Sequence, residues 1–197
     1  MKRLFDLFFT LIALIVLSPI MLSLVILIRL CFGNPVFFRQ IRPGLNGKPF
    51  TIYKFRTMLN AYDKNGHLLP DSERLTEFGK LLRQVSLDEL PELFNVLKGE
   101  MSLVGPRPLL MQYLTRYTPY QMRRHEIRPG ITGWAQIHGR NNTPFSKRFE
   151  MDIWYVDNHS LSLDFRIIIY TASKVIKREG VRTDLDQCFA EVNDCGL

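Results

Sequence analysis

Residues 4–32 read LFDLFFTLIALIVLSPIMLSLVILIRLCF, a run that is apolar except for one charge near each end, Asp6 and Arg29. A straight helix of these 29 residues would be about 43 Å long, whereas the hydrocarbon core of a bilayer is about 30 Å thick. A single straight crossing would therefore leave a surplus. A secretory signal peptide is the competing interpretation, but the run is too long for a typical signal core and no A-x-A cleavage site ends it.

Ser18-Pro19 stands in the middle of this apolar run. Proline removes a backbone donor and can bend a helix sharply, and each half of about 15 residues is too short to cross a bilayer alone. Cations flank both ends of the run: Lys2 and Arg3 precede it, and Arg29, Arg39 and Arg42 end or follow it. The positive-inside tendency then places both ends in the cytoplasm. We predict a re-entrant helix over residues 1–33, broken at Ser18-Pro19, in which the Ser18 hydroxyl bonds a freed carbonyl; a kinked single span is the alternative.

The chain of 197 residues is basic, with 26 Lys and Arg against 19 Asp and Glu and a formal net charge of +7. This charge favours anionic partners such as nucleic acid, phospholipid head groups or phosphorylated substrates. Residues 39–56 contain no acidic residue and five cations, Arg39, Arg42, Lys48, Lys54 and Arg56. Tyr53-Lys54-Phe55-Arg56 alternates aromatic and basic residues, but no nucleic-acid-binding motif accompanies it. We therefore predict membrane lipids and phosphorylated substrates as partners, and no nucleic acid.

The remaining chain mixes strand and helix patterns, which predicts an α+β fold. Residues 36–42 and 50–57 favour strands, and Asn46-Gly47 between them suits a hairpin turn. Residues 61–73 are polar and contain Pro70, so a mobile loop or lid is expected there. We expect a mostly helical cytoplasmic catalytic domain over residues 34–183, with interfacial amphipathic helices, followed by an acidic tail over residues 184–197.

Periodicity predicts three further helices and one more strand. These helices cover residues 74–83, 87–98 and 110–124, and the strand covers residues 131–137. In the second helix Leu90, Leu93, Phe94 and Leu97 share one apolar face, so we expect them in the core. Residues 163–177 combine apolar and basic side chains, as in a core helix or in a helix on a membrane surface.

Cysteines and histidines give no sign of a structural metal site. The three cysteines are odd in number and lack C-x-x-C spacing, and they are Cys31, Cys188 and Cys195. The four histidines are scattered without ligand spacing. We expect inert thiols in a reduced compartment. Neither a P-loop nor a dinucleotide-binding glycine pattern is present in the sequence.

Two adjacent carboxylates, Asp88 and Glu89, stand in the stretch Ser86-Leu87-Asp88-Glu89-Leu90. One interpretation is structural: Ser86 and Glu89 form a capping box, and Asp88 complements the helix dipole. Pro91 would then fall in the second helical turn, so the helix start is either distorted or later. The other interpretation is chemical, because one carboxylate of such a pair can attack phosphorus or bind Mg²⁺ while the other handles a proton. Arg83 would then clamp a phosphate.

Two arginines are framed by prolines. In Gly105-Pro106-Arg107-Pro108 the rings of Pro106 and Pro108 fix the backbone around Arg107, and a rigidly presented arginine suits a diphosphate. An ordinary turn with a solvated arginine is the alternative. Arg128 opens the second motif, Arg128-Pro129-Gly130-Ile131-Thr132-Gly133-Trp134, whose glycines would let a backbone approach a ligand. Its alternative is a strand entry with Trp134 in the core.

Taken in order, these segments resemble those of the small monotopic phosphoglycosyl transferases of the bacterial sugar transferase family. The matching stretches extend over nearly all of residues 2–180 and form a collinear set. They are KRLFD at residues 2–6, SP at 18–19, RPG at 42–44, YKFRTM at 53–58, SLDELPELFNV at 86–96, MSLVGPRP at 101–108 and RPGITGWAQ at 128–136. The tail after Gly180 follows no pattern of the family.

The resemblance implies a two-step, Mg²⁺-dependent transfer of a sugar 1-phosphate from a UDP-sugar to polyprenyl phosphate. In it Asp88, which would also bind the metal, attacks the β-phosphate, releases UMP and carries the phosphosugar. Glu89 is expected to assist the attack of polyprenyl phosphate on that intermediate. The cations expected to hold phosphates or uridine are Lys54, Arg83, Arg107 and Arg128. The implied location is the bacterial cytoplasmic membrane, with the catalytic domain on the cytoplasmic face, where the enzyme would initiate glycoconjugate synthesis.

Two other functions stay open at this point. The first is a non-catalytic membrane-anchored scaffold whose basic face binds acidic lipids or a partner glycosyltransferase. The second is a transferase that acts by direct displacement, with Asp88 only holding Mg²⁺. A homodimer and an association with downstream glycosyltransferases are compatible with each function. The donor sugar and the glycoconjugate pathway are not assigned from the sequence.

Overall fold

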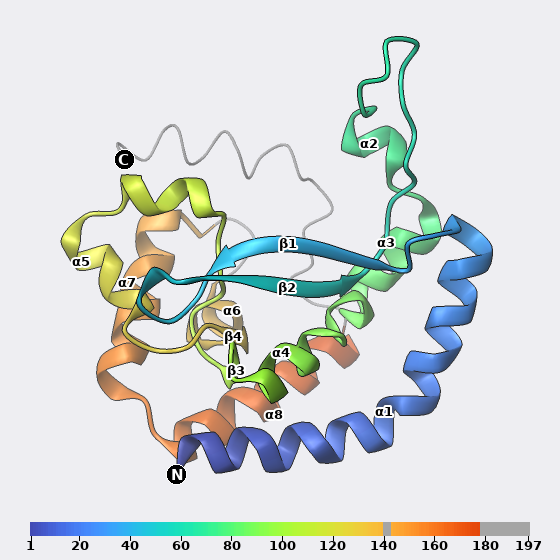
Figure 1. Ribbon diagram of the computed structural model, residues 1–197. Helices are drawn as coiled ribbons and strands as arrows, with labels where there is room; N and C mark the ends of the chain where they lie inside the picture. The colour runs from blue at the N-terminus through green and yellow to red at the C-terminus, as the bar shows by residue number, and fades with distance from the viewer. Residues whose placement is uncertain (140–142, 178–197) are drawn as a thin grey trace.

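The computed structural model describes residues 1–139 and 143–177. It combines helices with two small sheets, which confirms the mixed composition of the predicted fold (Figure 1). The hairpin of β1 (Phe37–Pro43) and β2 (Pro49–Phe55) runs across the middle of this view. Helices α4 (Glu92–Lys98) and α8 (Leu161–Lys177) lie between it and the N-terminal arm of α1 (Lys2–Phe32). The predicted acidic tail, Cys188 and Cys195 lie outside the described residues, whereas Cys31 is an exposed free thiol.

Helix α1 (Lys2–Phe32) is one continuous helix that bends in its middle, where Pro19 lies (Figure 1). Because Pro19 has no N–H, the carbonyl of Ile15 loses its helical partner, and the Ser18 hydroxyl donates to that carbonyl at 2.8 Å. The expected hydrogen bond from the Ser18 hydroxyl to a freed carbonyl is therefore present. The helix is long and apolar enough to cross a membrane by length and composition, and it leaves most of its apolar side chains exposed.

The N-terminal arm of α1 is attached to the rest of the chain by three charged residues, Lys2, Arg3 and Asp6, of which Lys2 donates to Asp164 Oδ2 at 2.5 Å. Asp6 is 2% exposed and accepts hydrogen bonds from the Ser102 hydroxyl, at 2.9 Å and 3.0 Å, and from the Leu103 amide, at 3.1 Å. Arg3 donates to the carbonyls of Val96 and Leu97 at 2.6 Å and 2.9 Å. These carbonyls belong to the last turn of α4, and that of Val96 also accepts from the amide of the capping residue Gly99 at 3.0 Å. Helix α1 is thus joined to the polar part of the fold at its first two turns.

Replacing Asp6 by alanine is expected to lower stability, because the hydroxyl and amide that it accepts from would be left buried without partners. Each such group costs about 1–3 kcal/mol. The midpoint of thermal unfolding in detergent, followed by tryptophan fluorescence, should fall by several degrees. An unchanged midpoint would contradict this role for Asp6.

Strands β1 (Phe37–Pro43) and β2 (Pro49–Phe55) form the predicted antiparallel hairpin, with Phe37 opposite Phe55. The turn is a short helical segment, η1 (Leu45–Gly47), in which Asn46 has φ 55° and Gly47 has φ 72°. The left-handed conformation explains the Asn-Gly pair, since these residues tolerate positive φ best. The buried face of the hairpin contributes to a small core: Phe50, Ile52, Val96 and Met101.

The predicted helix at residues 87–98 starts later than its periodicity suggests. Its first part is a 3₁₀ turn, η2 (Leu87–Glu89), and α4 (Glu92–Lys98) follows with Pro91 at its cap. Ser86 has φ 54° and its side chain makes no cap hydrogen bond, so the capping box is wrong. The core prediction is also wrong for Phe94, which is 41% exposed, because α4 buries Glu92, Leu93, Asn95 and Val96 instead.

Helix α3 (Glu77–Gln84) replaces the predicted helix at residues 74–83, and Thr76 caps it by accepting from the Gly79 amide at 3.0 Å. Before it, the expected loop at residues 61–73 projects from the body and ends in the short helix α2 (Asp71–Arg74) (Figure 1). Tyr62 and Leu68 form an isolated β-bridge within the loop. Thus the loop has local structure of its own, although the sequence indicated only its polarity.

The second sheet is small and parallel, with β3 (Ser102–Val104) beside β4 (Gly130–Thr132). The strand predicted at residues 131–137 is wrong beyond Thr132, where the chain turns into helix α6 (Trp134–His138). Gly133 permits this close turn, since a Cβ there would lie 2.2 Å from the Gly105 carbonyl oxygen. Trp134 is half-buried and stacks on Trp154, with ring centroids 4.4 Å apart, rather than lying fully in the core.

The predicted helix at residues 110–124 is three shorter pieces: η3 (Met111–Arg116), α5 (Pro119–Met122) and η4 (Arg123–His125). Periodicity misses the interruption before Pro119, which starts α5 behind a capping box of Thr118 and Gln121. Proline is favoured at the first helical position. Because it has no N–H, it does not continue a helix that comes before it in the chain.

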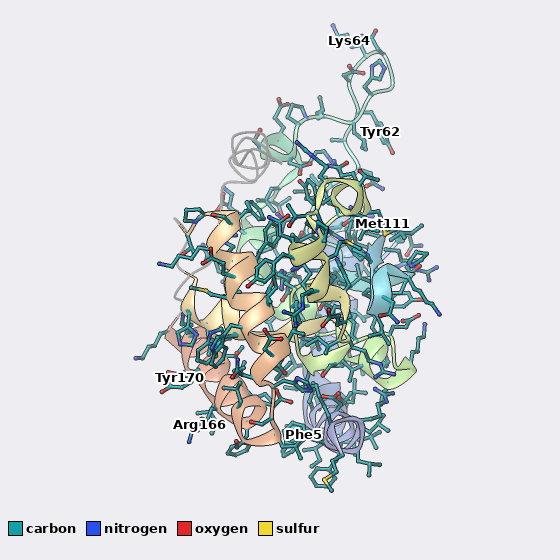
Figure 2. The ribbon with its side chains drawn as sticks, turned by 90° about the vertical axis from the view of Figure 1, so that its left-hand side faces the viewer. Phe5, Tyr62, Lys64, Met111, Arg166 and Tyr170 are labelled. Carbon is teal, nitrogen blue, oxygen red and sulfur yellow. The ribbon has the colours of Figure 1, made fainter. Side chains whose placement is uncertain are left out.

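Helices α7 (Phe145–Asn158) and α8 (Leu161–Lys177) complete the described chain. Helix α8 contains the segment 163–177, for which a core helix and a membrane-surface helix were the two predictions. It has a buried and an exposed apolar side: Ile167 is fully buried, while Phe165, Ile169 and Tyr170 are exposed. Figure 2 places Tyr170 and Arg166 of α8 at the same end of the molecule as Phe5 of α1, opposite Tyr62 and Lys64. One end of the fold is therefore apolar and basic, which suits a membrane surface.

Candidate active site

The 3₁₀ turn η2 places Asp88 and Glu89 where α3, β2 and α4 meet. The left-handed Ser86 reverses the chain after α3, and Pro91 starts α4 immediately behind the turn. Asp88 is thereby buried, at 8% exposure. The left-handed conformation of Ser86, which prevents the predicted capping box, thus also positions Asp88 and Glu89.

Glu89 accepts from two cations on other elements. Lys54 of β2 donates to Glu89 Oε1 at 2.6 Å. Arg107 grips both oxygens, with Nη1 3.3 Å from Oε2 and Nη2 on Oε1. Burial alone would raise the pKa of Glu89, but Arg107 and Lys54 hold it well below its ordinary value. Glu89 is therefore an anion at neutral pH in this arrangement.

Asp88 differs from its neighbour, because no residue of the described chain donates a hydrogen bond to its carboxylate. Burial, and then the charge of Glu89, raise the pKa of Asp88 from 3.8 to about 6. Lys54, Arg107 and Arg83 act in the opposite direction. Asp88 is thus a buried carboxylate with free oxygens, surrounded by cations that leave it mostly ionised at neutral pH. Such a group can bond to a metal or to phosphorus without first breaking an ion pair.

Glu92 is a third carboxylate of the cluster that the sequence analysis did not single out. It is 1% exposed, and its Oε1 lies 3.2 Å from Lys54 Nζ, so Lys54 pairs with both glutamates. Burial and the charge of Glu89 raise the pKa of Glu92 to about 7. Burial would lower the pKa of Lys54, but the same two carboxylates raise it. The i,i+3 spacing of Glu89 and Glu92 was a sequence signal for this proximity.

Arg83 and Arg42 border the same cluster. Arg83 donates from Nε to the Thr57 hydroxyl at 3.0 Å, and burial lowers its pKa while the charge of Asp88 opposes this. Arg42 is half-buried on β1 and close enough to Arg107 for the two charges to interact. Burial and then Arg107 lower the pKa of Arg42. The sequence places Arg42 among the basic residues of the hairpin but predicts no site role for it.

Of the four predicted phosphate-binding cations, the structure brings three to the carboxylates: Lys54, Arg83 and Arg107. Arg128 lies elsewhere and donates from Nε to the Gly99 carbonyl at 2.8 Å. It lines a hollow of about 320 Å³ together with Lys2, Arg3 and Asp6 at the start of α1. The arginines of the two motifs therefore lie in different places: Arg107 binds Glu89 in the carboxylate cluster, and Arg128 binds the Gly99 carbonyl near the start of α1.

The glycines of the second motif serve a different contact from the expected one. A Cβ on Gly130 would lie 2.0 Å from the Gly105 amide nitrogen, and one on Gly105 would lie 2.4 Å from the Arg128 carbonyl oxygen. The amide of Gly105 donates to Thr132 and that of Gly130 donates to Pro106. The close approach is thus between the two motifs themselves, and it fixes the turn that carries Arg107.

The donor set fits Mg²⁺ only if a substrate completes it. Within residues 1–139 and 143–177, no group of three or more His, Cys, Asp or Glu side chains is arranged to hold a metal. No residue in the described part of the chain donates a hydrogen bond to the Asp88 oxygens, whereas those of Glu89 are occupied by cations. Mg²⁺ is commonly held by one or two carboxylates together with substrate phosphates, and Asp88 meets that requirement.

Sequence comparison decides the family. The family model described as "Bacterial sugar transferase" matches residues 1–178, which is most of the chain. This chain belongs to the bacterial sugar transferase family. The resemblance inferred from the motifs is thereby confirmed, and the cluster of Asp88, Glu89 and three cations lies within the matched region.

Among its relatives in the family, the chain is 58% identical to an uncharacterized sugar transferase, EpsL, of Bacillus subtilis (strain 168), over 92% of this chain and 90% of that one. It is 44% identical to the UDP-glucose:undecaprenyl-phosphate glucose-1-phosphate transferase of Xanthomonas campestris pv. campestris, over 89% of this chain and 38% of that one. A third relative, 41% identical over 92% of this chain and 45% of its own, is the UDP-N-acetylgalactosamine-undecaprenyl-phosphate N-acetylgalactosaminephosphotransferase of Aeromonas hydrophila. The chain thus spans less than half the length of the latter two.

Proposed function

We propose that this protein transfers a sugar 1-phosphate from a UDP-sugar to undecaprenyl phosphate, with release of UMP, and so initiates the synthesis of a bacterial glycoconjugate. The observation that carries the proposal is Asp88, a buried carboxylate that lies among Lys54, Arg83 and Arg107 and to which no residue of 1–139 or 143–177 donates a hydrogen bond. The names of two relatives give the same reaction class for those proteins, with glucose in one and N-acetylgalactosamine in the other. The donor sugar is accordingly a property of the individual enzyme.

In the first step a carboxylate oxygen of Asp88 attacks the β-phosphorus of the donor. The P–O bond to the α-phosphate breaks, UMP leaves with that oxygen, and the sugar phosphate is held on Asp88 as a mixed anhydride. Lys54, Arg107 and Arg83 neutralise charge on the transferred phosphoryl group and on UMP, which is the main catalytic requirement of phosphoryl transfer. Mg²⁺ bound through Asp88 and the substrate phosphates would supply further charge neutralisation.

In the second step an oxygen of undecaprenyl phosphate attacks the same phosphorus, and the carboxylate of Asp88 is regenerated. Glu89 is the base proposed to take a proton from the attacking phosphate. In the structure it is held by Lys54 and Arg107, so it is a weak base there. Substrate phosphates compete with Glu89 for Lys54 and Arg107. When these cations bind the substrate instead, the pKa of Glu89 rises toward its ordinary value.

The rate of UMP release should depend on pH through Asp88. Its protonated form is not a nucleophile, and its pKa is raised to about 6. We expect kcat/KM for the donor to fall about tenfold for each pH unit below about 6, and to be level just above it. A profile that stays level down to pH 5 would contradict a nucleophile with this pKa. Continuous detection of UMP over pH 5–8, with stability checked at each pH, measures the profile.

We further propose that α1 is re-entrant in the cytoplasmic membrane, so that the site faces the cytoplasm. Its bend at Pro19 and the cations at both ends support this arrangement. Single cysteines introduced by Lys2→Cys or Val36→Cys, in a background in which Cys31, Cys188 and Cys195 are all replaced by serine, test it. A membrane-impermeant maleimide should label both positions in inverted vesicles and neither in intact spheroplasts. Labelling of the two positions from opposite sides would instead show a single span.

The reaction itself is tested by incubating purified protein with a panel of UDP-sugars, undecaprenyl phosphate and Mg²⁺. We expect UMP and a lipid-linked sugar phosphate from one or a few donors. No UMP from any donor, with a folded protein, would contradict the proposed function and favour a scaffold.

A further inference from the structure

Arg107 depends on another arginine for its backbone position. It stands between Pro106 and Pro108, which have no N–H, so this turn can make few hydrogen bonds of its own. The Arg107 carbonyl accepts a hydrogen bond from Arg124 Nη2 at 2.8 Å. A side chain 17 residues away therefore holds the backbone of the residue that grips Glu89.

Arg124 itself is fixed on every side. It is 3% exposed, in η4, and its Nε and Nη2 donate to Asp152 Oδ2 at 3.2 Å and 2.7 Å. Its Nη1 donates to the Tyr117 hydroxyl at 3.2 Å, and its guanidinium lies 5.3 Å from the centre of the Phe149 ring. All three guanidinium nitrogens are thus committed to the protein. Arg124 is not available to a ligand and acts only through what it holds.

The contacts form a continuous chain from α7 to the candidate active site. Asp152 of α7 orients Arg124, Arg124 holds the Arg107 carbonyl, and the Arg107 side chain reaches Glu89. We propose that Arg124 and Asp152 are a positioning pair that sets Arg107 for binding the donor diphosphate. This inference rests on the proposed function, and it deepens that function by assigning residues that do not touch the substrate.

The alternative is that this buried pair only stabilises the fold. A neighbouring pair provides the matched control, because Arg123 and Asp157 join the same two elements, η4 and α7. Arg123 donates to both oxygens of Asp157, but both side chains are partly exposed and neither contacts Arg107. If the only role of Arg124 were to join η4 to α7, substituting Arg124 and substituting Arg123 should lower activity to a similar extent.

The test is a double-mutant cycle between Arg124 and Arg107. Lysine at position 124 keeps the charge but cannot reach Asp152 and the Arg107 carbonyl with one planar fork. We expect Arg124→Lys to lower kcat/KM for the donor about 10- to 100-fold, since small displacements of a positioning group cost this much. In an Arg107→Lys background the same change should cost less than about threefold, because the group it positions is already altered. Arg123→Lys should cost about twofold or less.

The cycle is measured on two quantities, UMP release and calorimetric binding of UDP in the presence of Mg²⁺. Asp152→Asn keeps the shape of the side chain and serves as the second variant if Arg124→Lys unfolds, as judged by circular dichroism. Equal losses from Arg124→Lys with and without Arg107→Lys, or equal losses from Arg123→Lys, would overturn the positioning role while leaving the proposed function intact. A wild-type protein that neither releases UMP nor binds UDP would overturn the proposed function and this inference together.

Discussion

Replacing Asp88 by asparagine should abolish UMP release, with a loss of about 10,000-fold or more, because the amide cannot form the phosphosugar intermediate. Asparagine has nearly the same shape as aspartate, and no hydrogen bond to Asp88 would be lost among the described residues. The midpoint of thermal unfolding should therefore be equal to or above that of the wild type, since burial already disfavours the charge of Asp88. Both quantities are measured on the same purified protein, by UMP detection and by a thermal scan.

Asp157→Asn is the matched control for this variant, because Asp157 is a partly exposed carboxylate that pairs with Arg123 away from the cluster. We expect its activity to stay within about twofold of wild type. An Asp88→Asn protein that retains a tenth or more of the wild-type rate would show that Asp88 is not the nucleophile. If the protein is a scaffold, its function is binding to acidic membranes, and neither variant should change that binding.

Lys54→Gln is the second change with a large expected effect. Lys54 lies between Glu89 and Glu92, and the substrate phosphates would compete with these carboxylates for it. Its loss should lower UMP release about 100- to 1,000-fold, the usual cost of one preorganised group that stabilises transition-state charge. It also leaves the buried Glu92 without its cation and Glu89 with Arg107 alone, so the protein should be less stable at neutral pH.

The pH profile of Lys54→Gln distinguishes the electrostatic role from simple damage. Lys54 lowers the pKa of Asp88, so its removal should raise that pKa above about 6. The acid limb of kcat/KM would then move to higher pH, because a higher pH is needed to ionise Asp88. Lys98→Gln is the control, since Lys98 is exposed and donates to the Tyr53 hydroxyl on the same hairpin. An acid limb that stays in place would contradict the coupling between Lys54 and Asp88.

The local elements were the most predictable part of this fold. Composition and turn chemistry identify α1 and the β1–β2 hairpin, and Pro19 and Asn46 lie where the chain bends and turns. Periodicity failed where contacts between distant segments decide the backbone. The strand after Thr132 ends because Gly133 packs against Gly105, and such a contact has no signal at either position alone.

The candidate site was predictable in its chemistry but only partly in its geometry. The adjacent carboxylates and Arg107 were identified from residue type and framing prolines, and the structure brings them together. Periodicity places Glu92 within a helix, and its spacing from Glu89 predicts that the two carboxylates share a face. Arg128 precedes a proline as Arg107 does, yet it donates to the Gly99 carbonyl, because a following proline restricts the local backbone and not the direction in which the segment lies. Arg124 carries no motif at all, and only the fold shows what it holds.

The most direct test of the central claim is the intact mass of the protein after incubation with its UDP-sugar and Mg²⁺ and without undecaprenyl phosphate. We predict a mass increase equal to one sugar phosphate, located on the peptide that contains Asp88, absent from Asp88→Asn, and removed when undecaprenyl phosphate is added. An unmodified protein that nevertheless releases UMP rapidly, and only when undecaprenyl phosphate is present, would contradict a covalent intermediate and establish direct displacement instead.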